Sequence, residues 1–238
     1  MIRTLAAAAA WVDDVGLALL FPKADVVLPS LWEQVNGSAE ENWSIRDADG
    51  KFVSWSEPMG FLWPTKDELP EQGLTCVGKH LARVVSCVSP SLLPLLVAAN
   101  REPADDEPVV AAIRELGPST GPQLRAATGL DKKAVDRAIA SLHHRLVLTS
   151  SHLVEQDGPW GALAHDLIDR KWSVPKKLPA RETARRELAS LVLDWTGELT
   201  AADLSGVFGW RRKESAAILD EVAEGHDDEG GFRIWTRR

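Results

Sequence analysis

Three consecutive cationic residues, Arg211, Arg212 and Lys213, precede an amphipathic segment close to the C-terminus. Arginine binds phosphate or the major-groove edge of guanine through two parallel hydrogen bonds, so this group suits contact with DNA. The alternative is a solvated surface, but the start of a helix disfavours cations electrostatically, which favours a function. Arg233 and Arg237 lie in the last segment of the chain and would add contacts to the phosphate backbone.

A second basic group consists of Lys132, Lys133 and Arg137, at the start of another amphipathic segment. We expect the same kind of DNA contact from it. His143 and His144 follow where that segment ends, and the helix dipole accounts for cations there without a special role. No cysteine or carboxylate stands at ligand spacing beside the two histidines, so we expect neither a metal site nor a cofactor.

The chain contains ten tryptophans and no tyrosine, and five of the tryptophans lie in the first hundred residues. Trp43, Trp55 and Trp63 lie in a polar segment and are candidates for stacking on a base or on an apolar ligand. The alternative is that tryptophan fills the core of this half.

Few residues suggest catalysis. The chain has no Gly-rich phosphate loop, no Gly-x-Ser-x-Gly, no His-Glu-x-x-His and no Cys-x-x-Cys. Glu57, Asp67 and Glu68 are carboxylates near tryptophans, but their spacing does not distinguish them from surface residues. We therefore predict no catalytic residues.

An internal repeat in the second half positions both basic groups. A shift of the chain by 80 residues aligns glycines, a threonine and apolar residues in one phase: Gly117 with Gly197, Thr120 with Thr200, Leu124 with Leu204, and Gly129 with Gly209. Agreement of the apolar phase with the turn residues indicates two copies of one supersecondary unit.

The first copy reads as three helices followed by a hairpin. A helix over Val109–Leu116 precedes Thr120, which with Gln123 has the spacing of a capping box. Gly129 suits a left-handed turn before a third helix with apolar residues at helical spacing. The β-prone residues 146–149 and 153–154 flank polar residues, as the strands of a wing hairpin would.

The second copy repeats this pattern. We expect a helix over Ala184–Asp194, a capping box of Thr200 and Asp203, a turn at Gly209 and a third helix over Glu214–Ala223. Gly230-Gly231 is a plausible hairpin turn before a β-prone strand. Each copy is therefore predicted to be a winged helix-turn-helix.

The first hundred residues show weaker patterns. We expect strand and turn from Trp43 to Trp63, with a hairpin at Asp49-Gly50, and a helical segment starting at Pro64. The remaining expected elements are an extended segment at Leu17–Phe21 and helices at Thr4–Val15, Ser30–Val35, Val77–Val85 and Ser91–Ala99.

These elements define the expected organisation. The fold class is mainly α with some β (α+β): tandem winged helix-turn-helix repeats preceded by a Trp-rich α+β region. The predicted divisions are residues 1–100 for the acidic Trp-rich region, 109–158 for the first winged helix, 159–181 for a connecting helix and linker, and 182–238 for the second winged helix.

Charge is distributed unevenly. The net charge of −8 belongs entirely to residues 1–108, and the rest of the chain is neutral overall. We therefore expect the first half to be a poor nucleic-acid surface, and DNA contact to come from the later basic clusters. The absence of a credible signal peptide or membrane span predicts a cytoplasmic protein, in which Cys76 and Cys87 are buried thiols.

Four stretches carry a family resemblance: Trp11–Pro22, Leu28–Glu33, Trp63–Pro70 and Gly117–Leu142. With them the chain resembles the bacterial tandem winged-helix family of crosslink-repair DNA glycosylases, and more closely its short relatives. The resemblance implies several winged helices and binding of duplex DNA. Those glycosylases act through two glutamines that flank one residue, and this chain has no Gln-x-Gln.

Three functions follow from these features. The first is a non-enzymatic DNA-binding protein, either a regulator or an accessory repair factor, whose first half senses a small ligand, binds a protein or packs on the repeats. The second is a divergent glycosylase-like hydrolase that uses a carboxylate such as Glu57 or Glu68. The third is a winged helix that binds only proteins. The sequence does not predict an oligomeric state.

Overall fold

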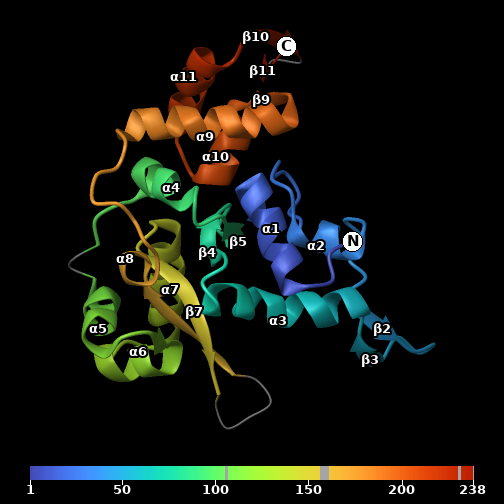
Figure 1. Ribbon diagram of the computed structural model, residues 1–238, viewed down its shortest axis with the longest axis vertical. Helices are drawn as coiled ribbons and strands as arrows, with labels where there is room; N and C mark the ends of the chain where they lie inside the picture. The colour runs from blue at the N-terminus through green and yellow to red at the C-terminus, as the bar shows by residue number, and fades with distance from the viewer. Residues whose placement is uncertain (105–106, 156–160, 230–231, 238) are drawn as a thin grey trace.

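The computed structural model describes residues 1–104, 107–155, 161–229 and 232–237 (Figure 1). Helices predominate over small antiparallel sheets, so the predicted α+β class is confirmed. Among the described residues, no helix is long and apolar enough to cross a membrane.

The N-terminal part contains a three-stranded sheet in the order β1-β5-β4 and a separate hairpin, β2-β3. The hairpin extends away from the rest of the molecule, beyond the N-terminal end of α3 (Figure 1). The elements are α1 (Leu5–Val15), β1 (Leu17–Leu19), α2 (Leu31–Asn36), β2 (Ser44–Arg46), β3 (Phe52–Trp55), α3 (Glu57–Glu71), β4 (Cys76–Leu81), β5 (Val84–Val88) and α4 (Leu93–Asn100).

The middle part contains a sheet in the order β6-β8-β7. Its elements are α5 (Pro108–Leu116), β6 (Ser119–Thr120), α6 (Gly121–Thr128), α7 (Lys132–His144), β7 (Leu148–Val154), β8 (Ala162–Leu167) and α8 (Ile168–Lys171). The C-terminal part has a sheet in the order β10-β11-β9, with α9 (Arg181–Thr196), β9 (Glu198–Thr200), α10 (Ala201–Phe208), α11 (Arg212–Val222), β10 (Gly225–Glu229) and β11 (Phe232–Thr236).

All three sheets share one topology. In each, the first strand pairs antiparallel with the last, and the last pairs with the middle one, as Leu17 with Val88 and Ile234 with Thr200 illustrate. A helix precedes each first strand, and two further helices lie between the first and middle strands. In the N-terminal part the hairpin β2-β3 is inserted between those two helices.

Local capping chemistry sets the helix boundaries in the second half. The side chains of Thr120 and Thr200 each accept a hydrogen bond from the backbone N–H three residues on. The side chains of Gln123 and Asp203 accept one in turn from the backbone N–H of the threonine, so both predicted capping boxes are confirmed. Gly129 ends α6 in the left-handed region at a φ of 70°, also as predicted. The expected turn at residues 230–231 lies outside the described residues.

The predicted helix over Val77–Val85 is wrong, because this segment is the β4-β5 hairpin. Ala82 and Arg83 form its turn with φ values of 50° and 57°, a conformation for which glycine or asparagine is the usual sequence signal. Most of β4 is also buried on both faces, so no alternation of polar and apolar residues indicates a strand.

Two further boundaries differ from expectation. Residues 148–154 form one strand with a bulge, and its partner is β8, not a second strand within 146–154. The polar residues expected at a turn, Ser150 and Ser151, are buried inside this strand. In the first half, α3 starts at Glu57 rather than at Pro64, because Ser56 caps it, and Trp63 is therefore helical.

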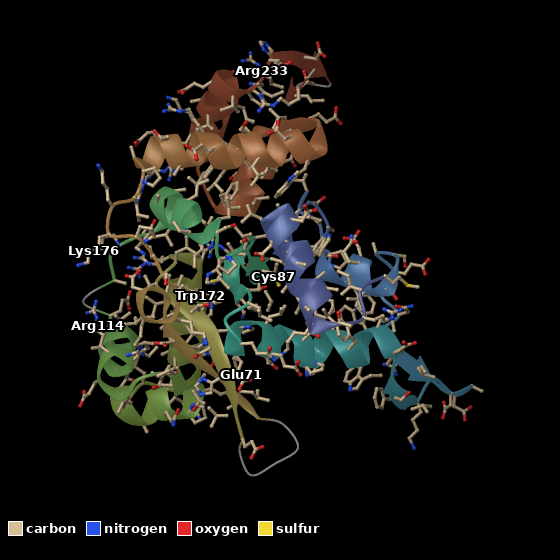
Figure 2. All side chains as sticks on the ribbon, in the orientation of Figure 1. Glu71, Cys87, Arg114, Trp172, Lys176 and Arg233 are labelled. Atoms are coloured by element: carbon tan, nitrogen blue, oxygen red, sulfur yellow. The ribbon has the colours of Figure 1, made fainter. Side chains whose placement is uncertain are left out.

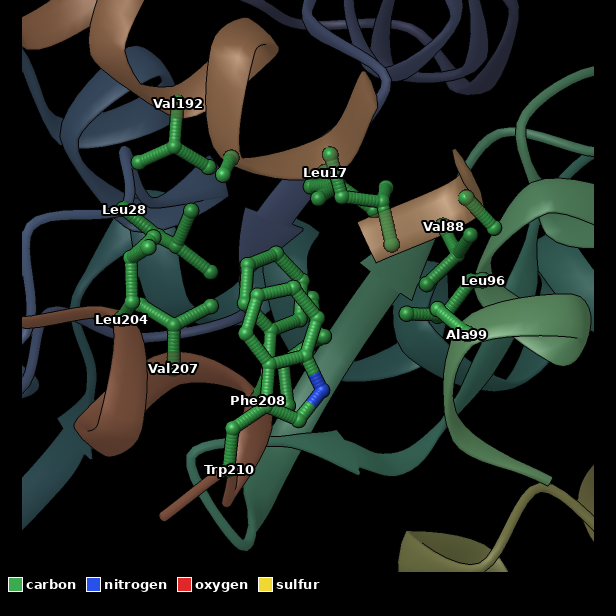
Figure 3. Packing of buried hydrophobic residues seen from close by; sticks show 14 of the residues in the cluster. Leu17, Leu28, Val88, Leu96, Ala99, Val192, Leu204, Val207, Phe208 and Trp210 are labelled. Atoms are coloured by element: carbon green, nitrogen blue, oxygen red, sulfur yellow. The ribbon is translucent and has the colours of Figure 1, made fainter. Parts of the chain in front are cut away.

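One hydrophobic core joins the two ends of the chain. Leu17 and Val88 of the N-terminal sheet pack in the same cluster as Val192 of α9 and the stacked rings of Phe208 and Trp210 (Figure 3). A second cluster lies between α1, α2 and α3, and a third lies within the middle part. The N- and C-terminal parts are thus held together by apolar burial.

Candidate nucleic-acid interface

Three adjoining cavities form a groove along the β4-β5 hairpin. The arginine cavity, of about 510 Å³, lies between the ends of α4 and α7, the start of α9 and the α10–α11 turn. The lysine cleft, of about 430 Å³, shares Arg83 with it. The histidine pocket, of about 360 Å³, shares Lys79 and Val85 with the lysine cleft.

The groove is cationic although the chain is acidic. Its lining contains four carboxylates, Asp67, Glu102, Asp136 and Glu214, against eight cations: Lys23, Lys66, Lys79, Arg83, Arg145, Arg181, Arg185 and Arg211. A concave surface with an excess of one sign of charge concentrates the field and attracts the opposite charge. An anionic polymer would therefore be drawn to this groove.

Several arginines of the arginine cavity are fixed by the protein itself. Arg145 pairs with Glu107 at 2.7 Å, and Arg181 donates a hydrogen bond to the carbonyl of Arg101 at 2.6 Å. Arg185 lies 5.2 Å from the centre of the Trp210 ring and pairs with Glu214 at 3.5 Å. Such anchored guanidinium groups lose little entropy when an anion binds.

Arg83 differs from these arginines. It is exposed at the β4-β5 turn, and among the described residues its guanidinium has no hydrogen bond or ion pair. The turn is held in place because the backbone N–H of Ala82 donates to the carbonyl of Val207 at 2.8 Å. Arg83 is thus a free cation on an anchored turn, at the point where two cavities meet.

Two histidine rings, His143 and His165, line the histidine pocket, and His80 is buried next to His143. His143 Nε2 lies 3.0 Å from His165 Nδ1, and the backbone carbonyl of His143 lies 2.8 Å from His80 Nδ1. Burial lowers the pKa of His80 and that of His165 from 6.5 to about 4, and lowers the pKa of His143 well below 6.5. All three rings are therefore neutral at pH 7.

Beside these rings lies an ion pair and a buried thiol. Lys66 Nζ lies 2.6 Å from Asp67 Oδ2, and both side chains are largely buried. Cys76 lies 3.5 Å from His80 Nε2, and burial raises its pKa to about 12, which keeps the thiol protonated. Cys76 and Cys87 are both free and buried, as predicted. Within the described ranges, no three His, Cys, Asp or Glu side chains are arranged to hold a metal ion.

A methyl group at Gly78 would overlap with the rings of His143 and His80. We expect Gly78→Ala to lower the free energy of unfolding by about 1–3 kcal/mol, because the rings must move against a packed core. Chemical denaturation measures the change. Gly121→Ala is the matched control, because a Cβ there meets no atom within 4 Å; an equal loss in both variants would contradict this packing.

Burial of neutral His80 predicts a pH-dependent stability. The unfolded chain takes up a proton below pH 6.5, whereas the folded pKa is about 4, so stability is greatest above pH 6.5 and falls as the pH decreases. For His80 alone we expect a loss of about 2 kcal/mol between pH 7.5 and pH 5. Urea unfolding at both pH values measures it. His80→Asn should show a weaker pH dependence, and an unchanged one would contradict the assignment.

The structure brings only part of the predicted DNA-binding set to the groove. Arg211 lines the arginine cavity, and Arg212 and Lys213 are exposed on the first turn of α11 beside it. Arg233 lies at the outer end of the C-terminal part, 3.8 Å from Asp220 (Figure 2).

The other predicted cations lie elsewhere. Arg237 binds Asp194 at 2.5 Å and the carbonyl of Val222 at 3.0 Å, so it fastens the end of the chain to α9 and α11. On α7, Lys132 pairs with Asp136 at 2.7 Å. Lys133 and Arg137 are exposed there, and none of these three α7 cations lines the groove.

The three tryptophans predicted as ligand candidates are exposed by 37–46%. Trp43 contacts Phe21 at a centroid distance of 5.3 Å, and Trp55 contacts Phe52 at 5.1 Å on the hairpin. Trp63 lies under the ammonium group of Lys66 at 4.4 Å. None of the three lines the groove.

Sequence reasoning missed most of the groove. Lys79 and Arg83 were hidden because they lie in a half that is acidic on average, within a segment predicted to be helical. His165 belongs to a strand that was predicted as a connector. Among the arginines of the groove, Arg211 belonged to the predicted DNA-binding set, and Arg181 and Arg185 lie in a basic stretch of sequence between the two repeats.

Comparison with known proteins places the chain in a family. A family model described as DNA glycosylase AlkZ-like matches residues 79–236, well over half of the chain. The chain belongs to this family, and the resemblance noted in the sequence is confirmed. The matched region includes Lys79, Arg83 and every arginine of the arginine cavity. No curated protein and no solved structure matches the chain.

Proposed function

We propose that this protein binds duplex DNA through the groove, as a non-enzymatic accessory factor of DNA repair or as a regulator. The observation that carries the proposal is the excess of cations in the groove of a chain with a net charge of −8. Membership of a DNA glycosylase family supports DNA as the partner. Phosphate contacts supply most of the affinity of such an interface.

The fold supports this proposal because its helices and strands fit a series of winged helices, a kind of module that often binds DNA. The shared strand order of the three sheets fits two winged helices in the second half and a third in the first hundred residues. The strands of the last sheet lie within the predicted division 182–238, whereas β8 extends the first winged helix beyond the predicted end at residue 158.

In this arrangement the third helices of the two repeats are the recognition helices, and both line the groove: α7 mainly with its C-terminal half, and α11 with its N-terminal end. Arg211, Arg212 and Lys213 then extend the cationic surface onto the first turn of α11.

The absence of Gln-x-Gln in the sequence supports a binding role over glycosylase activity of the family's kind. A glycosylase-like reaction with a carboxylate is the second candidate, and one observation favours it. Asp67 is 8% exposed and lines the histidine pocket, whereas Glu57 and Glu68 are exposed. If the chain is an enzyme, Asp67 is the carboxylate placed to act.

Fluorescence anisotropy of a labelled mixed-sequence duplex at two salt concentrations tests the proposal. We expect binding at low salt that weakens steeply as salt increases, because bound phosphates release counterions. No binding at low salt would exclude general DNA affinity and favour a winged helix that binds proteins. Incubation with alkylated duplex separates the two DNA-related candidates, since released base or abasic sites appear only if the protein is a glycosylase.

A further inference from the structure

The histidine pocket differs in character from the rest of the groove. Its wall contains neutral imidazole rings and apolar side chains, and its two carboxylates are paired, Asp67 with Lys66 and Asp136 with Lys132. The exposed Lys79 lies where the pocket meets the lysine cleft, so the interior of the pocket does not suit a phosphate, which prefers unpaired cations. The interior suits a neutral polar ring. Its volume of about 360 Å³ lies within the usual range of small-molecule sites, roughly 300–1,000 Å³.

The hydrogen-bond network fixes the proton on His165. His143 Nδ1 accepts a hydrogen bond from the backbone N–H of Lys79 at 3.2 Å, so the proton of neutral His143 is on Nε2. That Nε2–H donates to His165 Nδ1 at 3.0 Å. His165 therefore carries its own proton on Nε2, which makes no hydrogen bond to any described residue. The pocket wall thus presents one free N–H donor.

Asp67 supplies a complementary acceptor. Its Oδ2 binds Lys66, whereas its Oδ1 makes no hydrogen bond among the residues that the structure describes. Asp67 comes from α3 and His165 from β8, and both side chains line the pocket.

The rest of the lining is mostly apolar. It contains aliphatic side chains from β4, β5, α7 and β8 (Val77, Val85, Ile139, Ala140 and Leu163), together with Ser150 and Asp136. Gly78 contributes no side chain, and the rings of His80 and His143 pack closely against its backbone. Lys79 is exposed where this pocket meets the lysine cleft. A ring in the pocket can therefore be joined to a phosphate in the cleft.

We propose that the histidine pocket binds a nucleobase, with His165 donating to a ring acceptor and Asp67 accepting from a ring or amino N–H. Every nucleobase carries such a donor and acceptor on one edge. The base can come from a free nucleoside or from a strand lying in the groove. The second source rests on the proposed DNA-binding function, whereas the first does not.

Two titrations with 2-aminopurine distinguish these sources. The first uses the free 2-aminopurine deoxynucleoside, and the second uses a duplex that contains one 2-aminopurine. The base is fluorescent when unstacked, so binding of the free nucleoside changes its intensity, and extrusion from the duplex raises it. We expect a saturable change in at least one titration with the wild-type protein.

Variants then locate the site. We expect His165→Gln and Asp67→Asn each to lower the affinity for 2-aminopurine about tenfold, because each variant loses one hydrogen bond to the buried base. His152→Gln is the matched control, because His152 is a partly buried histidine on the neighbouring strand that does not line the pocket. Its response should equal that of the wild type. Thermal unfolding of both pocket variants is measured as well, because a loss of affinity is informative only in a folded protein.

The outcomes separate this inference from the proposed function. A response in the duplex alone, lost in His165→Gln, supports a base from a strand, and a response to the nucleoside supports a free base even if no duplex binds. Duplex binding by anisotropy with no 2-aminopurine response in either titration would overturn the pocket and leave the groove intact. A response that persists equally in His165→Gln and Asp67→Asn would also overturn it.

Discussion

Replacing Lys79, Arg83 and Arg211 together with alanine is expected to weaken duplex binding on the order of a hundredfold at low salt. The three residues are exposed, and between them they line all three cavities of the groove. Each ion pair with a phosphate contributes about 1 kcal/mol net, so the removal of three gives this factor. The slope of log affinity against log salt should also fall by about 0.9 for each phosphate that the variant no longer neutralises. Fluorescence anisotropy measures both.

Lys132, Lys133 and Arg137 provide the control for this variant. Their replacement with alanine removes the same charge from exposed positions on α7 that do not line the groove. We expect the affinity for the duplex to change by less than about threefold, because only the net charge of the protein differs and no contact in the groove is lost. Equal losses of affinity in the two triple variants would show that the groove is not the binding surface and would favour contact through the exposed cations of α7.

Trp210→Ala is expected to lower the free energy of unfolding by about 3–5 kcal/mol. The indole is 4% exposed and stacks on Phe208 at a centroid distance of 4.4 Å, inside the core that joins the two ends of the chain (Figure 3). Its N–H also donates to Asn100 Oδ1 at 2.6 Å. Truncation leaves a cavity and an unpaired amide oxygen, so urea denaturation should show a large loss of stability.

Two variants separate the causes of that loss. Trp210→Phe keeps the ring stack but removes the N–H donor, and should cost about 1–2 kcal/mol. Trp195→Ala removes a tryptophan that is 36% exposed on α9 and should cost less than about 1 kcal/mol. If Trp195→Ala were as destabilising as Trp210→Ala, the shared core would not explain the effect.

Much of the second half could be predicted from local chemistry. Thr120 and Thr200 cap helices whatever surrounds them, and Gly129 and Gly209 adopt the left-handed conformation that ends a helix. These signals act over a few residues, so they can be read from the chain. The family resemblance was carried in part by the same half and is confirmed by the family match.

The first half and the groove could not be predicted in this way. The β4-β5 hairpin turns at Ala82 and Arg83, which give no turn signal, and most of β4 is buried on both faces. The groove collects cations from segments that lie far apart in the chain, as Lys79 and Arg181 illustrate. The acidic average charge of the first half conceals Lys79, because only the folded chain brings this residue together with the cations of the other segments.

Photo-crosslinking would show whether duplex DNA lies in the groove. A duplex that contains 5-iodouracil is irradiated with the protein, and the crosslinked peptides are identified by mass spectrometry. We expect crosslinks to the β4-β5 turn around Arg83 and to the α10–α11 turn around Arg211. Crosslinks confined to α6 or to the β2-β3 hairpin would contradict binding in the groove.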